Sequence, residues 1–275
     1  MTTLTELYKS RCYEKNGKLI PHFWQPQPVE KAPLTLFGDD DLEVNPEWGV
    51  EPVIERILAL NYHLELDVGE FVASVASKDD LPDDPMVKPL LKANIADEAR
   101  HELGIKEAIK TYPVSQEYLD EAERIATRWS EDTQHYHPIV APFSLEVGVF
   151  LNVLGMLRLA GGKELANIGA RIAEDEARHT QVNRTILAHQ GYKPYNPPEK
   201  VRHLVWDTLN WAFAGVDIPE DEVGERVNLD FMKWASDSLI ETGEAMEFDD
   251  MVYCSDHLLP FEASNSKQYS RSVDS

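Results

Sequence analysis

The pentapeptide Asp-Glu-Ala-Arg-His occurs twice in the chain, ending once at His101 and once at His179. In each copy a glutamate, Glu98 or Glu176, lies three positions before the histidine. On a helix this spacing places both side chains on one face, with Cβ atoms about 5–6 Å apart. Carboxylates and imidazoles are both metal ligands. The repeated motif therefore predicts two helices that each contribute a pair of ligands to a metal site.

Both pairs share a helix face with apolar residues. A helix turns about 100° per residue, and at this period each Glu-His pair lies within a mostly apolar stripe that predicts burial. An unpaired buried carboxylate costs several kcal/mol, so we expect a compensating charge. The stripes consist of Val87, Leu91, Asn94, Ile95, Glu98, His101, Ile105 and Ile109 in the first helix, and of Leu165, Gly169, Ile172, Glu176, His179, Asn183 and Ile186 in the second.

A second pair of similar segments places a carboxylate upstream of each motif. The segment LDVGEF, which contains Asp67, resembles LEVGVF, which contains Glu146. Glu146 is the only acidic residue of its predicted helix, so its assignment as a ligand is unambiguous. In the earlier helix, Asp67 lies nearer than Glu65 to the centre of the apolar stripe, and Glu70 lies furthest round toward solvent. The pattern favours Asp67, with Glu70 and Glu65 as alternatives.

These candidates together make four carboxylates and two imidazoles, the ligand set of di-iron and di-manganese centres in four-helix bundles. Four carboxylates balance the charge of two divalent cations, and the mixture of oxygen and nitrogen donors suits iron or manganese better than structural zinc. Asp97 and Asp175 precede the two motif glutamates. Each is placed to accept a hydrogen bond from a histidine of the other helix. The alternative is that both are exposed acids.

The elements that must position these residues are helical. The predicted fold class is all-α, a four-helix bundle with additional flanking helices. We expect residues 1–47 to form an extended N-terminal arm, residues 48–260 the helical domain, and residues 261–275 a flexible C-terminal tail. The predicted helices cover residues 51–77, a segment that ends near 111, and residues 115–133, 139–160, 163–191, 199–214 and 222–258.

Composition narrows the range of partners. The 275 residues carry a formal charge of −23, which disfavours binding to nucleic acid or to an anionic membrane. The two cysteines, Cys12 and Cys254, are far apart and do not indicate a disulfide framework. The most apolar stretch contains Glu146 and Arg158, which favours a buried core helix over a membrane span. We therefore expect a cytoplasmic protein.

The segment IAEDEARH resembles the second metal motif of the ferritin-like superfamily, especially ribonucleotide reductase small subunits and related di-iron oxidases and oxygenases. The resemblance covers the four long helices, and two matched Glu-x-x-His motifs are a specific signal. It implies two iron ions, or a manganese–iron pair, with dioxygen as co-substrate. It further implies that Asp67, Glu98 and His101 hold one iron, that Glu146, Glu176 and His179 hold the other, and that Glu98 and Glu176 bridge them.

The leading hypothesis is an oxygen-dependent di-iron oxidase or oxygenase that acts on a small, largely apolar organic substrate. Hydroxylation, desaturation, N-oxygenation and aldehyde deformylation all agree with the resemblance. No flavin or nicotinamide motif is evident in the sequence, so an external reductase or ferredoxin would supply electrons. The resemblance also suggests a homodimer.

Two other functions belong to different classes. In tyrosine-radical reductase subunits the tyrosine follows the first ligand histidine by four positions, and here Ile105 stands there. An aliphatic side chain cannot carry the radical, although another radical site would serve. A ferroxidase or other iron-handling protein is the second alternative, but it would not need the extra helices and the arm. A third reading treats the two motifs only as buried ion-pair networks.

Overall fold

The computed structural model describes residues 3–192, 198–216 and 218. Most of the described chain is helical, which confirms the all-α fold class. The helix expected at 222–258 and the tail expected at 261–275 lie outside the described residues.

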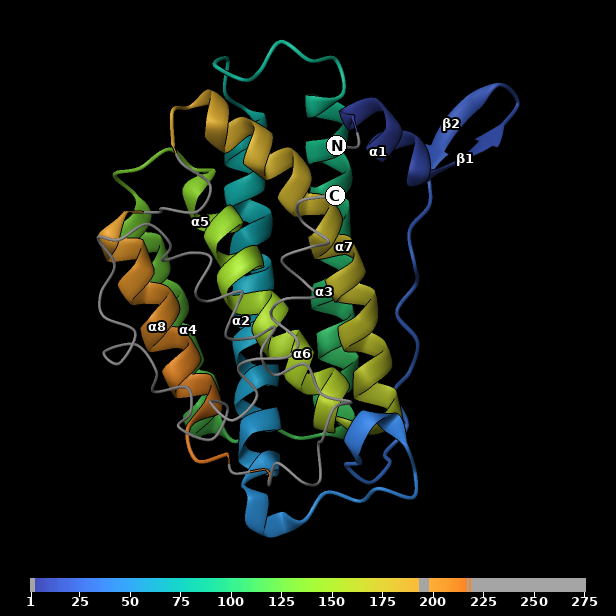
Figure 1. The fold of residues 1–275 in the computed structure, drawn as a ribbon, viewed down its shortest axis with the longest axis vertical. Helices are drawn as coiled ribbons and strands as arrows, with labels where there is room; N and C mark the ends of the chain where they lie inside the picture. The colour runs from blue at the N-terminus through green and yellow to red at the C-terminus, as the bar shows by residue number, and fades with distance from the viewer. Residues whose placement is uncertain (1–2, 193–197, 217, 219–275) are drawn as a thin grey trace, which may run out of the picture.

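Four long helical segments pack into a closed ring (Figure 1). The first two pack against each other, the last two do the same, and the ring closes where α3 meets α7 and α2 meets α6. The third segment begins as a short α-helix, passes through a π-helical stretch called η3, and continues as α6. The segments are α2 (Val50–Ala76), α3 (Val87–Thr111), α5 (Val140–Ser144) with η3 (Leu145–Phe150) and α6 (Leu151–Ala160), and α7 (Gly162–His189).

Two further helices flank the ring beside α2. Helices α4 (Gln116–Thr133) and α8 (Glu199–Phe213) pack against α2 and against each other. The indole nitrogen of Trp129 in α4 donates a hydrogen bond of 3.0 Å to Thr208 in α8. The side chain of Trp129 is fully buried and links α4 to α8. The predicted helix positions agree with these bounds to within a few residues.

The N-terminal arm contains more secondary structure than expected. It begins with α1 (Leu4–Ser10), continues as an antiparallel hairpin of β1 (Cys12–Lys15) and β2 (Lys18–Pro21), and ends in the 3-10 turns η1 (Leu36–Gly38) and η2 (Pro46–Trp48). The strands have four residues each and are mostly exposed, so they lack the apolar alternation that reveals a strand. The turn between them, Asn-Gly, has positive φ at both residues, as a tight hairpin requires.

The most apolar stretch of the described chain, residues 140–160, is long and apolar enough to cross a membrane. Most of it, 89% of its most apolar window, is instead buried inside the protein. It forms the third segment of the ring, which explains its composition as that of a core helix.

Candidate metal centre

The ring encloses two overlapping groups of buried metal-ligating side chains. In each group, one potential ligand atom from every member lies within 4.8 Å of the others. All members are at most 2% exposed. The first group is Glu65, Glu98, His101 and Glu176, and the second is Glu98, Glu146, Glu176 and His179.

The carboxylate that α2 contributes to these groups is Glu65, whereas Asp67, which the sequence pattern favours, lies outside both. Glu65 is fully buried, and its Oε2 lies 3.2 Å from Nδ1 of His101. Asp67 is half-buried outside both groups, where burial and the nearby Glu70 raise its pKa to about 6. Glu70 is exposed.

The difference between the apolar stripe and the observed placement has a physical cause in the packing of α2. This helix contacts α3, α4, α6 and α8, so its buried arc is wider than the apolar stripe that the sequence shows. The arc extends past the stripe through Ile54, Leu58 and Asn61 to Glu65 and Val72. Asp67 lies on the opposite edge of the stripe. The apolar residues of the sequence alone do not show that Glu65 lies inside the buried arc, because they mark only one part of it.

Glu146 reaches the cluster from the π-helical stretch η3. Single π-helical turns are rare and occur frequently at functional sites. Both oxygens of Glu146 accept hydrogen bonds from Asn183 Nδ2, at 2.8 and 2.7 Å. Oε1 of Glu146 lies 3.8 Å from Nδ1 of His179. Burial raises the pKa of Glu146 well above its ordinary value, and the nearby carboxylate of Glu176 adds to the effect.

Glu98 and Glu176 are shared between the two groups. Glu98 presents Oε2 to His101 Nδ1 at 3.2 Å and Oε1 to His179 Nδ1 at 3.0 Å. Glu176 also faces both histidines, but with its two oxygens exchanged: Oε1 lies 3.3 Å from His101 Nδ1 and Oε2 lies 3.2 Å from His179 Nδ1. The two imidazole rings lie 5.9 Å apart between centroids. Each of the two glutamates therefore faces both histidines, one with each of its oxygens.

The other nitrogen of each histidine faces an aspartate on the opposite motif helix. His179 Nε2 lies 3.1 Å from Asp97 Oδ2, and His101 Nε2 lies 3.3 Å from Asp175 Oδ2. Both aspartates are buried, and Arg178 forms an ion pair with Asp175. Each motif therefore supplies one aspartate to the histidine of the other motif.

The acidic and imidazole groups of the cluster shift one another's pKa values. Burial opposes a charged imidazolium, but Glu176 and Glu98 outweigh it and raise the pKa of His179 to about 10. The pKa of His101 is also raised well above its usual value, against burial, chiefly by Glu65. Burial by itself would raise the pKa of Glu98, but the two histidines lower it below its ordinary value. Burial, acting against the nearby His101 and His179, raises the pKa values of Glu65 and Glu146 and favours their neutral form, whereas Glu98 is balanced by the charge of the two histidines.

The donor set could hold a metal ion, because it has more oxygen acceptors than the two imidazoles can satisfy. Each Nδ1 faces at least two carboxylate oxygens within 3.3 Å, although a single N–H donates well to only one of them. Within the described part of the chain, Oε1 of Glu65, of Glu98 and of Glu176 is buried without a hydrogen-bond partner. Buried acceptors of this kind are costly unless a cation compensates them.

The N-terminal arm also reaches the centre, through residues that the sequence analysis missed. Arg11 forms a buried ion pair with Asp97, and Trp24 donates a hydrogen bond of 3.0 Å to Asp175. The Trp24 ring stacks on His101, with centroids 6.3 Å apart. The one available signal was that Trp24 lies in a proline-rich segment, PHFWQPQP, where a large apolar side chain needs a packing partner.

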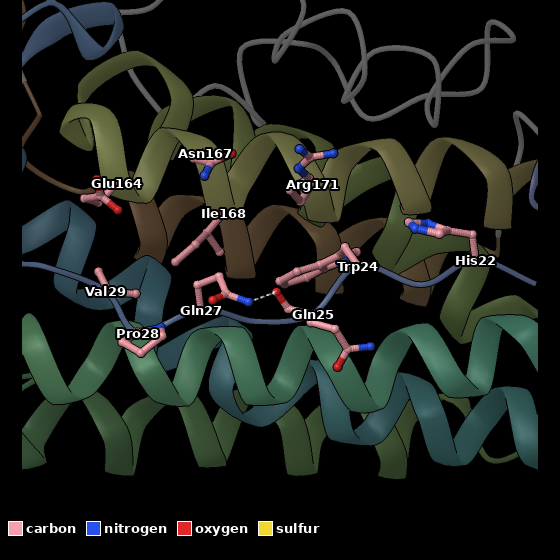
Figure 2. Close-up of a pocket in the computed structure, with 10 residues that line it drawn as sticks. All are labelled: His22, Trp24, Gln25, Gln27, Pro28, Val29, Glu164, Asn167, Ile168 and Arg171. Carbon is pink, nitrogen blue, oxygen red and sulfur yellow. Dashed lines mark hydrogen bonds between the residues drawn. The ribbon is translucent and has the colours of Figure 1, made fainter.

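A cavity of about 310 Å³ lies between the arm and α7 (Figure 2). Trp24, Pro28 and Val29 line it from the arm, and Ile168 and Arg171 are among its lining residues on α7. Since Trp24 also contacts Asp175 and His101, the cavity adjoins the outer side of the centre. None of the six side chains of the two groups lines it.

No family model matches the chain, and no curated protein and no solved structure matches it either. The geometry of the cluster therefore carries the argument for function.

Proposed function

We propose that the protein is a non-haem di-iron oxidoreductase of the ferritin-like kind, which uses dioxygen to oxidise a small, largely apolar organic substrate. The observation that carries the proposal is the sharing of Glu98 and Glu176 between two buried groups, each of which also holds one histidine and one further carboxylate. Six side chains of this chemistry, contributed by a ring of four helices, match the ligand set of di-metal carboxylate proteins.

Glu65 and His101 would hold one iron, Glu146 and His179 would hold the other, and Glu98 and Glu176, which belong to both groups, would contribute to each. Bound iron would supply the reduction of dioxygen and the oxidation of the substrate. The chain holds the ligands in place before the metals bind, since each histidine is fixed at Nε2 by an aspartate. Burial of all six ligands keeps bulk water away from the reacting atoms.

The electrons would come from a separate reductase or ferredoxin. Among the described residues there is no βαβ unit of the kind that binds a flavin or a nicotinamide, because the strands there are confined to one short hairpin and an isolated bridge. Hydroxylation, desaturation, N-oxygenation and aldehyde deformylation are the reactions that we propose to test.

The radical-generating and iron-handling alternatives make different demands on the same centre. Ile105, one helical turn beyond His101, is fully buried and aliphatic, which argues against a tyrosyl radical at this position. A ferroxidase would consume oxygen only in proportion to added ferrous iron. An oxygenase would continue to consume oxygen when an organic substrate and reductant are present.

The test begins with protein loaded anaerobically with ferrous iron and then desalted. We expect two irons per chain, and we expect each of His101→Ala and His179→Ala to lose at least one of them. Loaded protein would then be mixed with oxygen, reductant and a panel of aliphatic acids, aldehydes and amines, while oxygen consumption and products are measured. The di-iron assignment would be refuted if the unaltered protein retained no iron, or if neither substitution changed the iron content.

A further inference from the structure

We infer that the base of the N-terminal hairpin is part of the metal centre, and that Arg11 and Trp24 are positioning residues for His179 and His101. This inference rests on the proposed function and deepens it, since it assigns a role at the same site to a segment outside the helical ring. The two residues act through the aspartates and do not contact the proposed metals.

The hairpin brings Arg11 and Trp24 to the same place. The backbone N–H of His22 donates a hydrogen bond of 2.6 Å to the carbonyl of Arg11, which closes the base of the hairpin. The tip projects away from the ring of helices, while α1, next to the base, packs against α3 and α7 (Figure 1). Residues 11 and 22–24 therefore form one docked unit over the junction of the two motif helices.

On the side of His179, the contact is a buried guanidinium. Arg11 is 5% exposed and donates to Oδ2 of Asp97 and, at 2.9 Å, to the side chain of Asn94. The same Oδ2 lies 3.1 Å from His179 Nε2. A buried arginine far from a counter-charge would be costly, so this guanidinium is placed to hold the side chain of Asp97 in position against His179.

On the side of His101, the contact is an indole. Trp24 Nε1 donates to Oδ2 of Asp175 at 3.0 Å, and the same oxygen lies 3.3 Å from His101 Nε2. The ring is nearly parallel to that of His101, with an interplanar angle of 22°. It fits because position 104 is glycine: a Cβ there would lie 2.9 Å from the edge of the Trp24 ring.

A third contact shows that the arm docks on the first motif as a whole. The guanidinium of Arg100 lies over the ring of Phe23, 4.0 Å from its centroid. Asp97, Arg100 and His101 thus each contact the arm. The arm thus contacts three of the five residues in the first copy of the motif. We infer that its role at the centre goes beyond packing.

The chemical consequence follows from histidine tautomers. An aspartate oxygen that accepts a hydrogen bond from Nε2 makes that nitrogen the donor and leaves the lone pair of Nδ1 free for a metal. A donor from the arm, Arg11 or Trp24, keeps the aspartate oxygen oriented toward the ring. Because linkage is reciprocal, metal binding must then stabilise the docked arm as much as the docked arm stabilises metal binding.

The first test compares metal affinities in the full-length protein. Ferrous iron is titrated anaerobically into the Trp24→Phe and Arg11→Met variants, and cobalt(II) is used in parallel because its absorption reports ligand geometry. Loss of a partner of a metal ligand weakens binding 10–100-fold; since these residues act one step further out, we expect about tenfold. Trp24→Phe should weaken the binding of the metal held by His101, and Arg11→Met should weaken the binding of the metal held by His179.

Two matched controls separate positioning from general packing. Trp48→Phe alters another half-buried tryptophan that precedes α2. Arg56→Met removes another buried arginine, which donates to backbone carbonyls near the end of α8. Both should keep the affinity of the unaltered protein. If Arg11→Met does not fold, Trp24→Phe remains informative, because it removes the indole N–H and keeps a smaller aromatic ring, as the control Trp48→Phe also does.

The second test uses hydrogen exchange and needs no activity. The amide of His22 should exchange more slowly after metal loading, whereas the exposed turn at residues 16–17 should not change. Unaltered protein that binds two metals, with variants that bind them equally well and with no change at His22, would overturn the inference and leave the di-iron assignment intact. Failure of the unaltered protein to bind metal would instead refute the proposed function, and this inference with it.

Discussion

Glu98 and Glu176 each direct one carboxylate oxygen to Nδ1 of His101 and the other to Nδ1 of His179, at separations of 3.0–3.3 Å. The two glutamates come from α3 and α7, the two helices that carry the repeated motif. This reciprocal relationship makes the two halves of the cluster interdependent, and it determines how each ligand substitution should behave.

Substitution of a shared ligand should remove both metals. We expect Glu98→Ala to retain little or no iron after anaerobic loading and desalting, because both groups lose a carboxylate at once. Glu146→Ala alters only the group that contains His179 and should retain about one iron per chain. Metal analysis of both variants checks this. Equal loss in the two variants would mean that the metals bind as an inseparable pair.

The first ring helix offers a comparison between neighbouring acids. Glu65→Ala should weaken the group that contains His101, whereas Asp67→Ala should bind iron as the unaltered protein does, because Asp67 lies outside both groups. Anaerobic titration of ferrous iron measures both. A strong effect of Asp67→Ala combined with none of Glu65→Ala would restore the assignment that the sequence alone favoured.

The sequence was sufficient for the parts of the site that repeat or that have local periodicity. The two Glu-x-x-His pairs were predictable because both residues lie on one helix face, and Glu146 because no other acid competes in its helix. Glu65 was ranked below Asp67 because the wide buried arc of α2 depends on the helices around it.

The contacts of the arm were not predictable for a related reason. Arg11 meets Asp97 across 86 residues, and Trp24 meets Asp175 across 151 residues. Neither the spacing nor the composition of the arm encodes these pairings. Only the folded ring, with the glycine at position 104 facing Trp24, brings them together.

Replacing one buried acid should affect stability with opposite signs in the two metal states. Burial raises the pKa of Glu146 well above its ordinary value, so Glu146→Gln, which resembles the protonated acid, should leave the metal-free protein as stable or more stable. In the presence of metal it should be less stable, because bound metal at one hundred times its Kd contributes about 2.7 kcal/mol per site. Thermal unfolding with and without ferrous iron tests both signs. A lower Tm in both states would contradict the prediction.

Two glycines within the long helices should respond differently to alanine. A Cβ at Gly69 would lie 3.4 Å from Cβ of Glu98, an ordinary contact, and alanine favours a helix by up to about 1 kcal/mol over glycine. Gly69→Ala should therefore keep or raise the Tm. Gly104→Ala should displace the Trp24 ring and weaken metal binding as Trp24→Phe does. Unfolding and metal titrations of the pair measure this, and unchanged affinity in Gly104→Ala would show that Trp24 is not needed in its present position.

Metal binding should release protons, and the affinity should rise with pH. Glu176 and Glu98, acting against burial, raise the pKa of His179 to about 10, so the metal-free protein holds this histidine charged at neutral pH. A folded-state pKa above the ordinary 6.5 stabilises the metal-free protein fully below about pH 6.5, and this contribution is lost as the pH approaches 10. A metal at Nδ1 requires the neutral ring, and it must therefore displace the proton.

Calorimetric titrations of ferrous iron in buffers of different ionisation enthalpy should show proton release at pH 7. They should also show tighter binding at pH 8 than at pH 6, since fewer protons then compete. Binding without proton release would mean that the metals occupy a site other than this cluster.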